Sequence, residues 1–290
     1  DRTNRRPSGS YAAIRTASAA ISQMHRINLF PSPTLSLPCT MVRSAAKRSL
    51  GLAVRNNKEP FTWANVCSLI NDRCQHSTGF SSWIIATMAA ICFAGFCRYS
   101  DAANLLWEDV SFHGSYMELC FKKRKNDQHK LHGVVRVAKL PGNPYCVFDL
   151  TSRYRTVMAR FSSPLKWVFP SFCGTALLRL GDHACEPLPT PLSYQAYRRY
   201  LARWMGPLLP TPLPPAAFLA RFGTHSSRSG GASAAANADI PFAIWGQHGG
   251  WRSASSQLRY MGLDETHVLS VTRAILSLAR EDESSDDDPQ

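Results

Sequence analysis

Three side chains near the end of the chain have the types and spacing to act on a phosphate group. His225 and Arg228 stand three residues apart at the start of a predicted helix, so they share one face of it. A helix N-terminus attracts anions through its free N–H groups and its dipole, and arginine adds a charged donor. The pattern predicts a phosphate cradle, with a solvated helix start as the alternative. Tyr260 follows in the polar segment GGWRSASSQLRYMG and is either a nucleophile or a packed aromatic side chain.

Two earlier segments carry further candidates. Arg98 ends the longest apolar run of the chain, and an arginine at such depth needs a partner, which Asp101 can supply from three residues away. The alternative for this pair is a purely structural ion pair. The basic segment KKRKNDQHK, residues 122–130, connects two strand-like segments, so one of its lysines can reach into a site. Its alternative is a solvated hairpin tip.

The elements that must position these residues are mainly helical. Apolar periodicity and capping residues predict helices over residues 11–28, 40–54, 63–74, 80–97, 101–112, 146–160, 193–205, 225–239, 241–248, 254–261 and 265–280. Alternating patterns predict strands over 115–121 and 132–140. The expected helix caps are Thr62, Thr224 and Ser253, with Pro241 at a first helical position and Gly249, Gly250 and Gly262 at helix ends. The helix after Thr224 consists of small residues, which lets other backbones approach it closely. The predicted fold is α+β with a small antiparallel sheet.

Charge points to an anionic partner. The 290 residues carry a net charge of +13, yet six of the 20 acidic residues lie in the tail 281–288, which leaves 33 basic against 14 acidic residues in the body, or +19. This balance favours nucleic acid or an acidic membrane surface. The apolar run 83–97 has 15 residues, too few to span a bilayer, and is expected to be a buried helix. Nine cysteines without a C-x-x-C pair favour buried thiols over a zinc site or a disulfide framework.

Taken in order along the chain, the candidate residues resemble the active site of the tyrosine recombinases, also called phage-type integrases. The set that carries the resemblance is Arg98, Lys125, His225, Arg228, Trp251 and Tyr260. The segment THSSRSGGASAAANADIPFAIWGQHGGWRSASSQLRYM is similar to that of Cre-like members, and GFCRYSDAANLLWEDV to the first arginine box. KRKNDQ resembles the hairpin lysine box of eukaryotic DIRS-like elements and picks out Lys125. A DIRS-like or Crypton-like element would act in the nucleus, and any other source implies cytoplasm or nucleoid.

The resemblance implies a domain plan and a reaction. Residues 1–58 would be a partial helical core-binding domain with a linker, 59–280 the catalytic domain and 281–290 an acidic tail. The enzyme would cut and rejoin double-stranded DNA through a 3′-phosphotyrosine, without metal, ATP or another cofactor. By this resemblance, Tyr260 would attack the phosphate, and Lys125 would protonate the departing 5′ oxygen. Arg98 and Arg228 would clamp the phosphate, Trp251 would donate a hydrogen bond to it, and Asp101 would support Arg98. His225 would accept a proton or orient the phosphate.

Other functions stay open at this point. A type IB topoisomerase or a telomere resolvase uses similar chemistry, but the segment from Trp251 to Tyr260 argues against both. A DNA-binding protein that no longer cuts is a further alternative, against which the complete residue set argues. The amphipathic helix 265–280 is expected either to pack on its own domain or to dock into a neighbouring subunit, so that four protomers form a ring on two DNA duplexes. No association with a membrane is expected.

Overall fold

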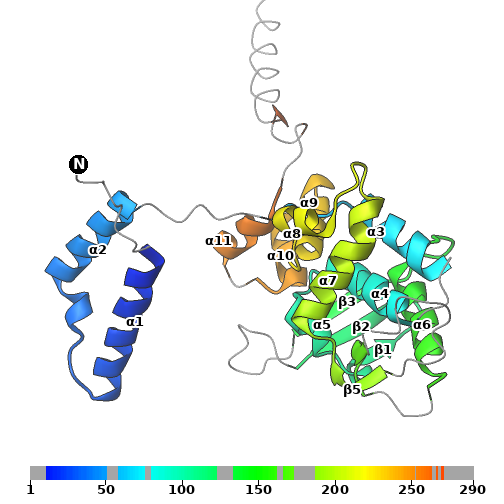
Figure 1. The fold of residues 1–290 in the computed structure, drawn as a ribbon, viewed down its shortest axis with the longest axis horizontal. Helices are drawn as coiled ribbons and strands as arrows, with labels where there is room; N and C mark the ends of the chain where they lie inside the picture. Colours follow the sequence, from blue (N-terminus) through cyan, green and yellow to red (C-terminus); the bar gives the residue numbers. More distant parts are fainter. Residues whose placement is uncertain are drawn as a thin grey trace, which may run out of the picture. The chain divides into compact units, whose positions relative to one another are not determined.

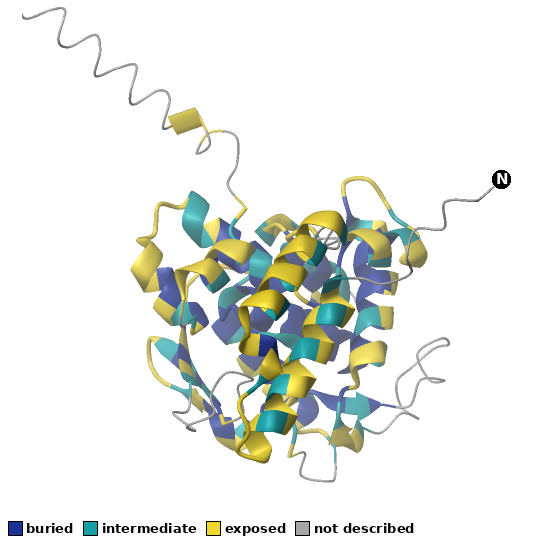
Figure 2. Ribbon diagram, turned by 90° about the vertical axis from the view of Figure 1, so that its left-hand side faces the viewer, coloured by how far each residue is buried: buried dark blue, intermediate teal, exposed yellow. Residues whose placement is uncertain are grey.

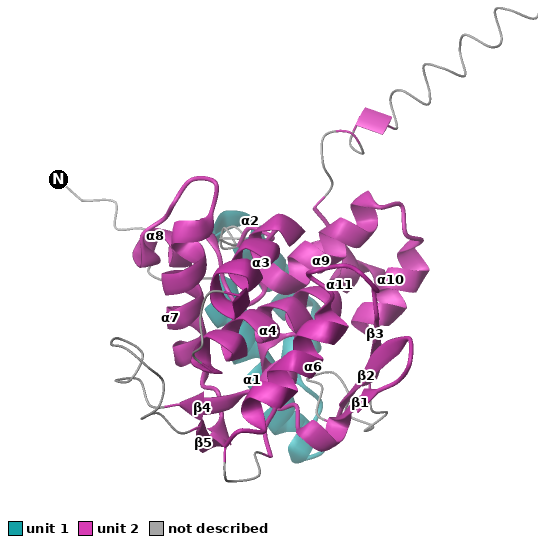
Figure 3. Ribbon diagram, turned by 90° about the vertical axis from the view of Figure 1, so that its right-hand side faces the viewer, with its two compact units in different colours: residues 1–57 teal, residues 58–290 magenta. Residues whose placement is uncertain are grey.

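The computed structural model describes residues 11–50, 58–75, 80–122, 133–161, 166–172, 187–251, 253–262, 266 and 269–270. The chain divides into two compact units, residues 1–57 and 58–290 (Figure 3). The division falls next to the boundary expected at residue 58. The identity of the first unit as a partial core-binding domain stays a prediction.

The first unit is a pair of helices. Helix α1 (Tyr11–Ile27) leads through the 3-10 turn Pro33–Leu35 to helix α2 (Leu37–Leu50). Helix α2 begins three residues before the predicted start at 40, because a proline is tolerated in the first turn of a helix, where its missing N–H has no partner to lose. The helices of this unit are mostly exposed or half-buried (Figure 2), and among its described residues Thr34 alone is buried.

The second unit is built around one buried helix. Its α-helices are α3 (Trp63–Ile70), α4 (Phe80–Ala94), α5 (Tyr99–Ala103), α6 (Val147–Met158), α7 (Tyr194–Met205), α8 (Pro215–Arg221), α9 (Ser226–Asn237), α10 (Phe242–Gly249) and α11 (Ala254–Gln257). Helix α4 packs against α3, α6, α7 and α9, and fourteen of its fifteen residues are buried (Figure 1). The longest apolar run is therefore a core helix, as predicted. No described helix is long and apolar enough to cross a membrane.

Two small antiparallel sheets complete the unit. Strands β1 (Val110–Phe112), β2 (Tyr116–Phe121) and β3 (Gly133–Ala138) form the first in the order β1-β2-β3. The prediction of β2 and β3 is confirmed, whereas the helix predicted over 101–112 is wrong beyond Ala103, where α5 ends. There a 3-10 turn, closed by the Leu106 N–H to the Asp109 carboxylate at 3.2 Å, leads into β1. The proline-rich strands β4 (Pro170–Phe172) and β5 (Pro187–Pro191) lack strand alternation in their sequence and were not predicted.

The helix caps near the candidate residues differ partly from expectation. Thr62 and Ser253 cap α3 and α11 through their side chains, as predicted. Thr224 is not the cap of α9, because a turn held by the Gly223 N–H to Ser226 Oγ at 2.9 Å delays the helix, so that His225 takes the capping position.

Two further helix boundaries shift by a residue or two. Pro241 precedes α10 instead of opening it, and the turn after α11 ends at Tyr260, two residues before the expected stop at Gly262. Gly250 ends α10 in the left-handed conformation at φ 65°, which glycine adopts without steric cost. Most of the predicted helix 265–280 lies outside the described residues.

The small residues of α9 allow the close packing that the sequence predicts. A Cβ atom on Gly230 would lie 2.1 Å from the carbonyl oxygen of Phe61, and one on Gly231 would lie 2.1 Å from that of Phe93. Helix α9 therefore lies directly on backbone at the end of α4. This contact brings the helix that carries Arg228 against the segment that carries Arg98.

Candidate active site

The end of α4 shapes the floor of the candidate site. Phe96 has a left-handed backbone at φ 48°, a conformation that costs a non-glycine residue about 1–2 kcal/mol. Bonds from the Cys97 N–H to Cys92 O at 3.1 Å and from the Phe96 N–H to Phe93 O at 3.4 Å complete a Schellman motif around it. The turn directs the Phe96 carbonyl toward α9, where it accepts a hydrogen bond from Arg228 Nη1.

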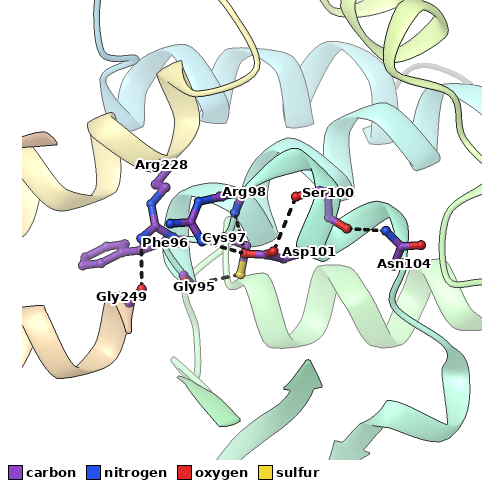
Figure 4. Close-up of polar contacts among 9 residues, drawn as sticks. All are labelled: Gly95, Phe96, Cys97, Arg98, Ser100, Asp101, Asn104, Arg228 and Gly249. Carbon is purple, nitrogen blue, oxygen red and sulfur yellow. Dashed lines mark hydrogen bonds and ion pairs between the residues drawn. The ribbon is translucent and has the colours of Figure 1, made fainter. Parts of the chain in front are cut away.

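Arg228 is enclosed completely. Its side chain is 0% exposed, and Nη2 donates to the carbonyl of Gly249 at 3.0 Å (Figure 4). Its guanidinium carbon lies 4.1 Å from the ring centroid of Trp251 and 5.0 Å from that of Tyr260, distances typical of cation–π contacts. Burial, together with the nearby charge of Arg98, lowers the pKa of Arg228 to about 10, which leaves the side chain cationic at neutral pH.

Arg98 lies beside this enclosed arginine. It occupies the N-cap of α5, and Figure 4 shows its side chain next to that of Arg228. Asp101 is buried and accepts from the Arg98 backbone N–H at 3.2 Å, while Arg98 Nη1 is 3.9 Å from the same carboxylate oxygen. The Asp101 carboxylate is thus closer to the backbone N–H of Arg98 than to its guanidinium. Two cations side by side repel each other, so the pair favours an anion between or above them.

Trp251 and Tyr260 contact Arg228, and His225 lies beside Tyr260. The Trp251 and Tyr260 ring centroids are 5.3 Å apart, and the exposed His225 ring lies 6.2 Å from that of Tyr260. Both Trp251 and Tyr260 are half-buried, in a small cluster with Phe96 that is separate from the main core. The Trp251 indole nitrogen and Arg228 Nε are buried, and no described residue accepts a hydrogen bond from either. Of the six residues that carry the resemblance, the five that the structure describes therefore lie close together.

His248 belongs to the framework of the site and was missed by the sequence reasoning. Its Nε2 donates to the Ala94 carbonyl at 2.8 Å, and its ring packs edge-on against Phe96 with centroids 4.8 Å apart. This contact fastens α10 to the end of α4 and so fixes the loop that carries Trp251. A histidine next to the two helix-ending glycines was the available signal, but its partner is a backbone atom 154 positions away.

Lys125 lies outside the described residues, whereas its neighbour Lys122 is described and directly follows β2. Lys122 Nζ lies 2.7 Å from Asp109 Oδ1 and 2.7 Å from Glu108 Oε1. The hydrogen bonds to these two carboxylates raise the pKa of Lys122 above its ordinary value. A lysine held in this way is a weaker proton donor than a free one.

The chemistry of these residues is that of anion binding beside a phenol. Two arginines and an indole N–H surround a tyrosine, with an imidazole close by. Within the described residues, no group of three or more His, Cys, Asp or Glu side chains is placed to hold a metal ion. The residues present suit a phosphate ester, whose oxygens accept from guanidinium and indole donors.

Known structures share this architecture. No protein-family model matches the sequence, and no curated protein does. The chain is similar to the Tn1549 transposon integrase in complex with circular intermediate DNA, at a TM-score of 0.51 and 14% identity over 93% of this chain and 80% of that one. Another structure of that integrase, a substituted form with a related DNA, reaches a TM-score of 0.54 at 13% identity with the same coverages. The XerH site-specific recombinase, in a post-cleavage complex, matches at 0.50 and 9% identity over 91% and 72% of the two chains.

The chain has the tyrosine-recombinase fold. The predicted class, mainly helical α+β with a small antiparallel sheet, is thereby confirmed. Within this fold the candidate residues come from the start of α5, the start of α9, the loop after α10 and the short turn after α11. The recombinase fold thus brings to one place residues that are up to 162 positions apart in the sequence, from Arg98 to Tyr260.

Proposed function

We propose that this protein is a site-specific DNA recombinase or integrase that cuts and rejoins strands through a 3′-phosphotyrosine. The Tyr260 oxygen attacks the scissile phosphorus, the bond from phosphorus to the 5′ oxygen breaks, and the phenol proton passes to His225. Lys125 protonates the departing 5′ oxygen. The phosphotyrosine keeps the bond energy, so that another 5′-hydroxyl reverses these steps and joins a new strand without ATP.

The observation that carries the proposal is the position of the Tyr260 ring over Arg228. A phenol has a pKa near 10 and is a weak nucleophile at neutral pH, so attack requires that charge on the phosphate oxygens be stabilised. The guanidinium of Arg228 is 5.0 Å from the Tyr260 ring, and Arg98 lies next to it. These arginines would supply the positive charge that metal ions supply in many nucleases. Trp251 would add a hydrogen bond through its indole N–H.

The geometry of Lys122 supports a different lysine as general acid. A general acid must release its proton during the reaction, and the two carboxylates at 2.7 Å oppose this for Lys122. The same ion pairs hold the end of β2, from which the hairpin loop leaves. The role therefore falls to Lys125, on the resemblance of the KRKNDQ segment to the family's lysine box.

The proposed partner is double-stranded DNA, in keeping with the net charge of +19 in the body of the chain. We propose further that four protomers assemble on two duplexes through the segment 265–280. A mobile genetic element is the proposed source, and a eukaryotic element of the DIRS or Crypton type would place the enzyme in the nucleus. These proposals rest on the resemblance and on charge.

A covalent-trapping assay tests the proposed function. The substrate is a DNA duplex nicked next to the cleavage site, so that the released 5′-hydroxyl strand diffuses away and the protein stays attached. The unsubstituted protein should yield a DNA-linked band, and Tyr260→Phe should bind DNA equally well yet give none. Tyr194→Phe, which alters an exposed tyrosine on α7, is the matched control. A band that persists in Tyr260→Phe contradicts the nucleophile assignment, and specific binding without any band identifies a DNA-binding protein that does not cut.

A further inference from the structure

The chain around Tyr260 is held by a serine on the arginine helix. The Ser233 hydroxyl donates to the carbonyl of Tyr260 at 3.3 Å and accepts from the N–H of Gly262 at 2.9 Å. Ser233 is 8% exposed, and both bonds are partly buried. One hydroxyl thus bridges the backbone on both sides of Met261, where the chain leaves the short turn that ends at Tyr260.

These bonds satisfy backbone groups that the turn leaves without partners. The last carbonyls of a helical turn accept no hydrogen bond from within the turn. Met261, the next residue, is already extended at φ −86° and ψ 121°, so the turn does not continue. Asn237, one turn further along α9, donates from Nδ2 to the Gly262 carbonyl at 3.3 Å. On the other side of Tyr260, the buried Gln257 donates to the Phe242 carbonyl at 2.5 Å. The nucleophile segment is therefore fastened to α10 before Tyr260 and to α9 after it.

The position of Ser233 links the phosphate site to the nucleophile. Ser233 lies five residues after Arg228 on α9, a rise of about 7.5 Å along one helix. A helix of this length is rigid. Because Gly230 and Gly231 have no side chain, α9 also packs directly on the backbone of other segments. Helix α9 thus relates the arginine to the Tyr260 backbone, and the Ser233 hydroxyl is the contact from α9 that reaches the Tyr260 carbonyl itself. An alanine would fit the run of small residues equally well, but it would make neither bond.

We propose that Ser233 is a positioning residue, which sets the distance from the Tyr260 nucleophile to the phosphate that Arg228 binds. The inference rests on the proposed function and deepens it. Ser233 touches neither the phosphate nor the reacting atoms and acts through the backbone of Tyr260. Since a displacement of about 1 Å costs roughly 100-fold in rate, loss of the hydroxyl should slow attack without weakening DNA binding.

The test compares three variants in single-turnover cleavage of the nicked duplex at saturating protein. Ser233→Ala should form the covalent complex about 10- to 100-fold more slowly, with DNA affinity within about twofold of the unsubstituted protein. Ser233→Thr keeps the hydroxyl and should restore the rate to within a few fold. Ser229→Ala is the matched control, because that serine lies on the same helix and its hydroxyl bonds to the His225 carbonyl at 2.9 Å rather than to the segment after Tyr260.

A substrate with sulfur at the 5′ bridging position separates positioning from proton donation. A thiolate leaves without a proton, so this substrate rescues a missing general acid but leaves a misplaced nucleophile slow. Ser233→Ala should therefore stay slow on it. Recovery on this substrate, a rate within twofold of the unsubstituted protein, or a Ser233→Thr variant that is folded by its unfolding midpoint yet as slow as Ser233→Ala would each overturn the inference. If the unsubstituted protein itself forms no covalent complex, the proposed function fails instead.

Discussion

The two arginines share a proposed role in catalysis, but their surroundings predict very different effects on folding. Arg228 is 0% exposed, and its guanidinium donates to the carbonyls of Phe96 and Gly249. Arg98 retains 16% exposure of its side chain and has one ion-pair distance of 3.9 Å, to Asp101. We therefore expect Arg228→Ala to destabilise the second unit strongly, and Arg98→Ala to leave it almost unchanged.

The magnitude follows from the groups that each substitution leaves behind. Removing the Arg228 side chain deprives two carbonyls of a charged donor, and a lost bond of this kind costs about 1.5–3 kcal/mol. The contacts with the Trp251 and Tyr260 rings are lost as well, while the relief from burying a charge offsets part of the total. Two such bonds, less this relief, amount to about 4 kcal/mol. For Arg98→Ala we expect about 1 kcal/mol or less, because Asp101 keeps its backbone donor and the repulsion on Arg228 disappears.

Thermal and urea unfolding of the two variants provide the measurement. For a unit of this size, 1 kcal/mol shifts the midpoint by about 2–4 °C, so Arg228→Ala should unfold roughly 8–16 °C earlier and Arg98→Ala within about 4 °C of the unsubstituted protein. Arg228→Lys keeps the charge and should fall between the two. Equal midpoints for the two alanine variants would refute the enclosure of Arg228. The comparison also shows which arginine variant is suitable for kinetics, since an unfolded protein reports nothing about catalysis.

Three further predictions follow from charge, from the hairpin loop and from the end of the chain. DNA affinity should fall steeply between low and physiological salt, because a body of charge +19 displaces many counterions, and a flat titration would contradict this. Lys125→Ala should regain cleavage on the substrate with a 5′ bridging sulfur, whereas rescue of Lys122→Ala instead would move the general acid to the other lysine. Deletion of 265–290 should leave binding to a single site intact and abolish two-duplex complexes and recombination. Normal recombination by the truncated protein would show that this segment packs within its own subunit or has no role.

Much of the fold was predictable because it depends on local patterns. Three local patterns predicted their elements: the apolar run of α4, the alternation in β2 and β3, and the small residues of α9. In each case the predicted element buries the side chains that make the pattern. The corrections arise where a tertiary contact or a turn overrides the local pattern. The start of α9 is an example, since Thr224 is a good capping residue, yet the Ser226 hydroxyl closes a turn that moves the helix onward by one residue.

The details of the site were less predictable. Residue types and order suggested which side chains would meet, but not that Arg228 would lie with no exposed surface. The left-handed backbone of Phe96 has no signal in the sequence, because glycine is the usual residue in that conformation and Gly95 stands one position too early. The bonds of His248 and Ser233 end on backbone atoms of distant segments, and the identity of a residue says nothing about a backbone partner.

The enclosure of Arg228 has a consequence for the proposed reaction. If Arg228 binds the scissile phosphate, the phosphate reaches it only after the Tyr260 or Trp251 ring has moved, since these rings lie 5.0 Å and 4.1 Å from the guanidinium. A cation–π contact contributes about 0.5–2 kcal/mol, whereas each hydrogen bond from a guanidinium to an anionic oxygen contributes about 1.5–3 kcal/mol. Two such bonds to one phosphate, about 3–6 kcal/mol, therefore outweigh a single ring contact. The Tyr260 backbone is held by Ser233 and the chain just before it by Gln257, so this movement is confined to the side chain.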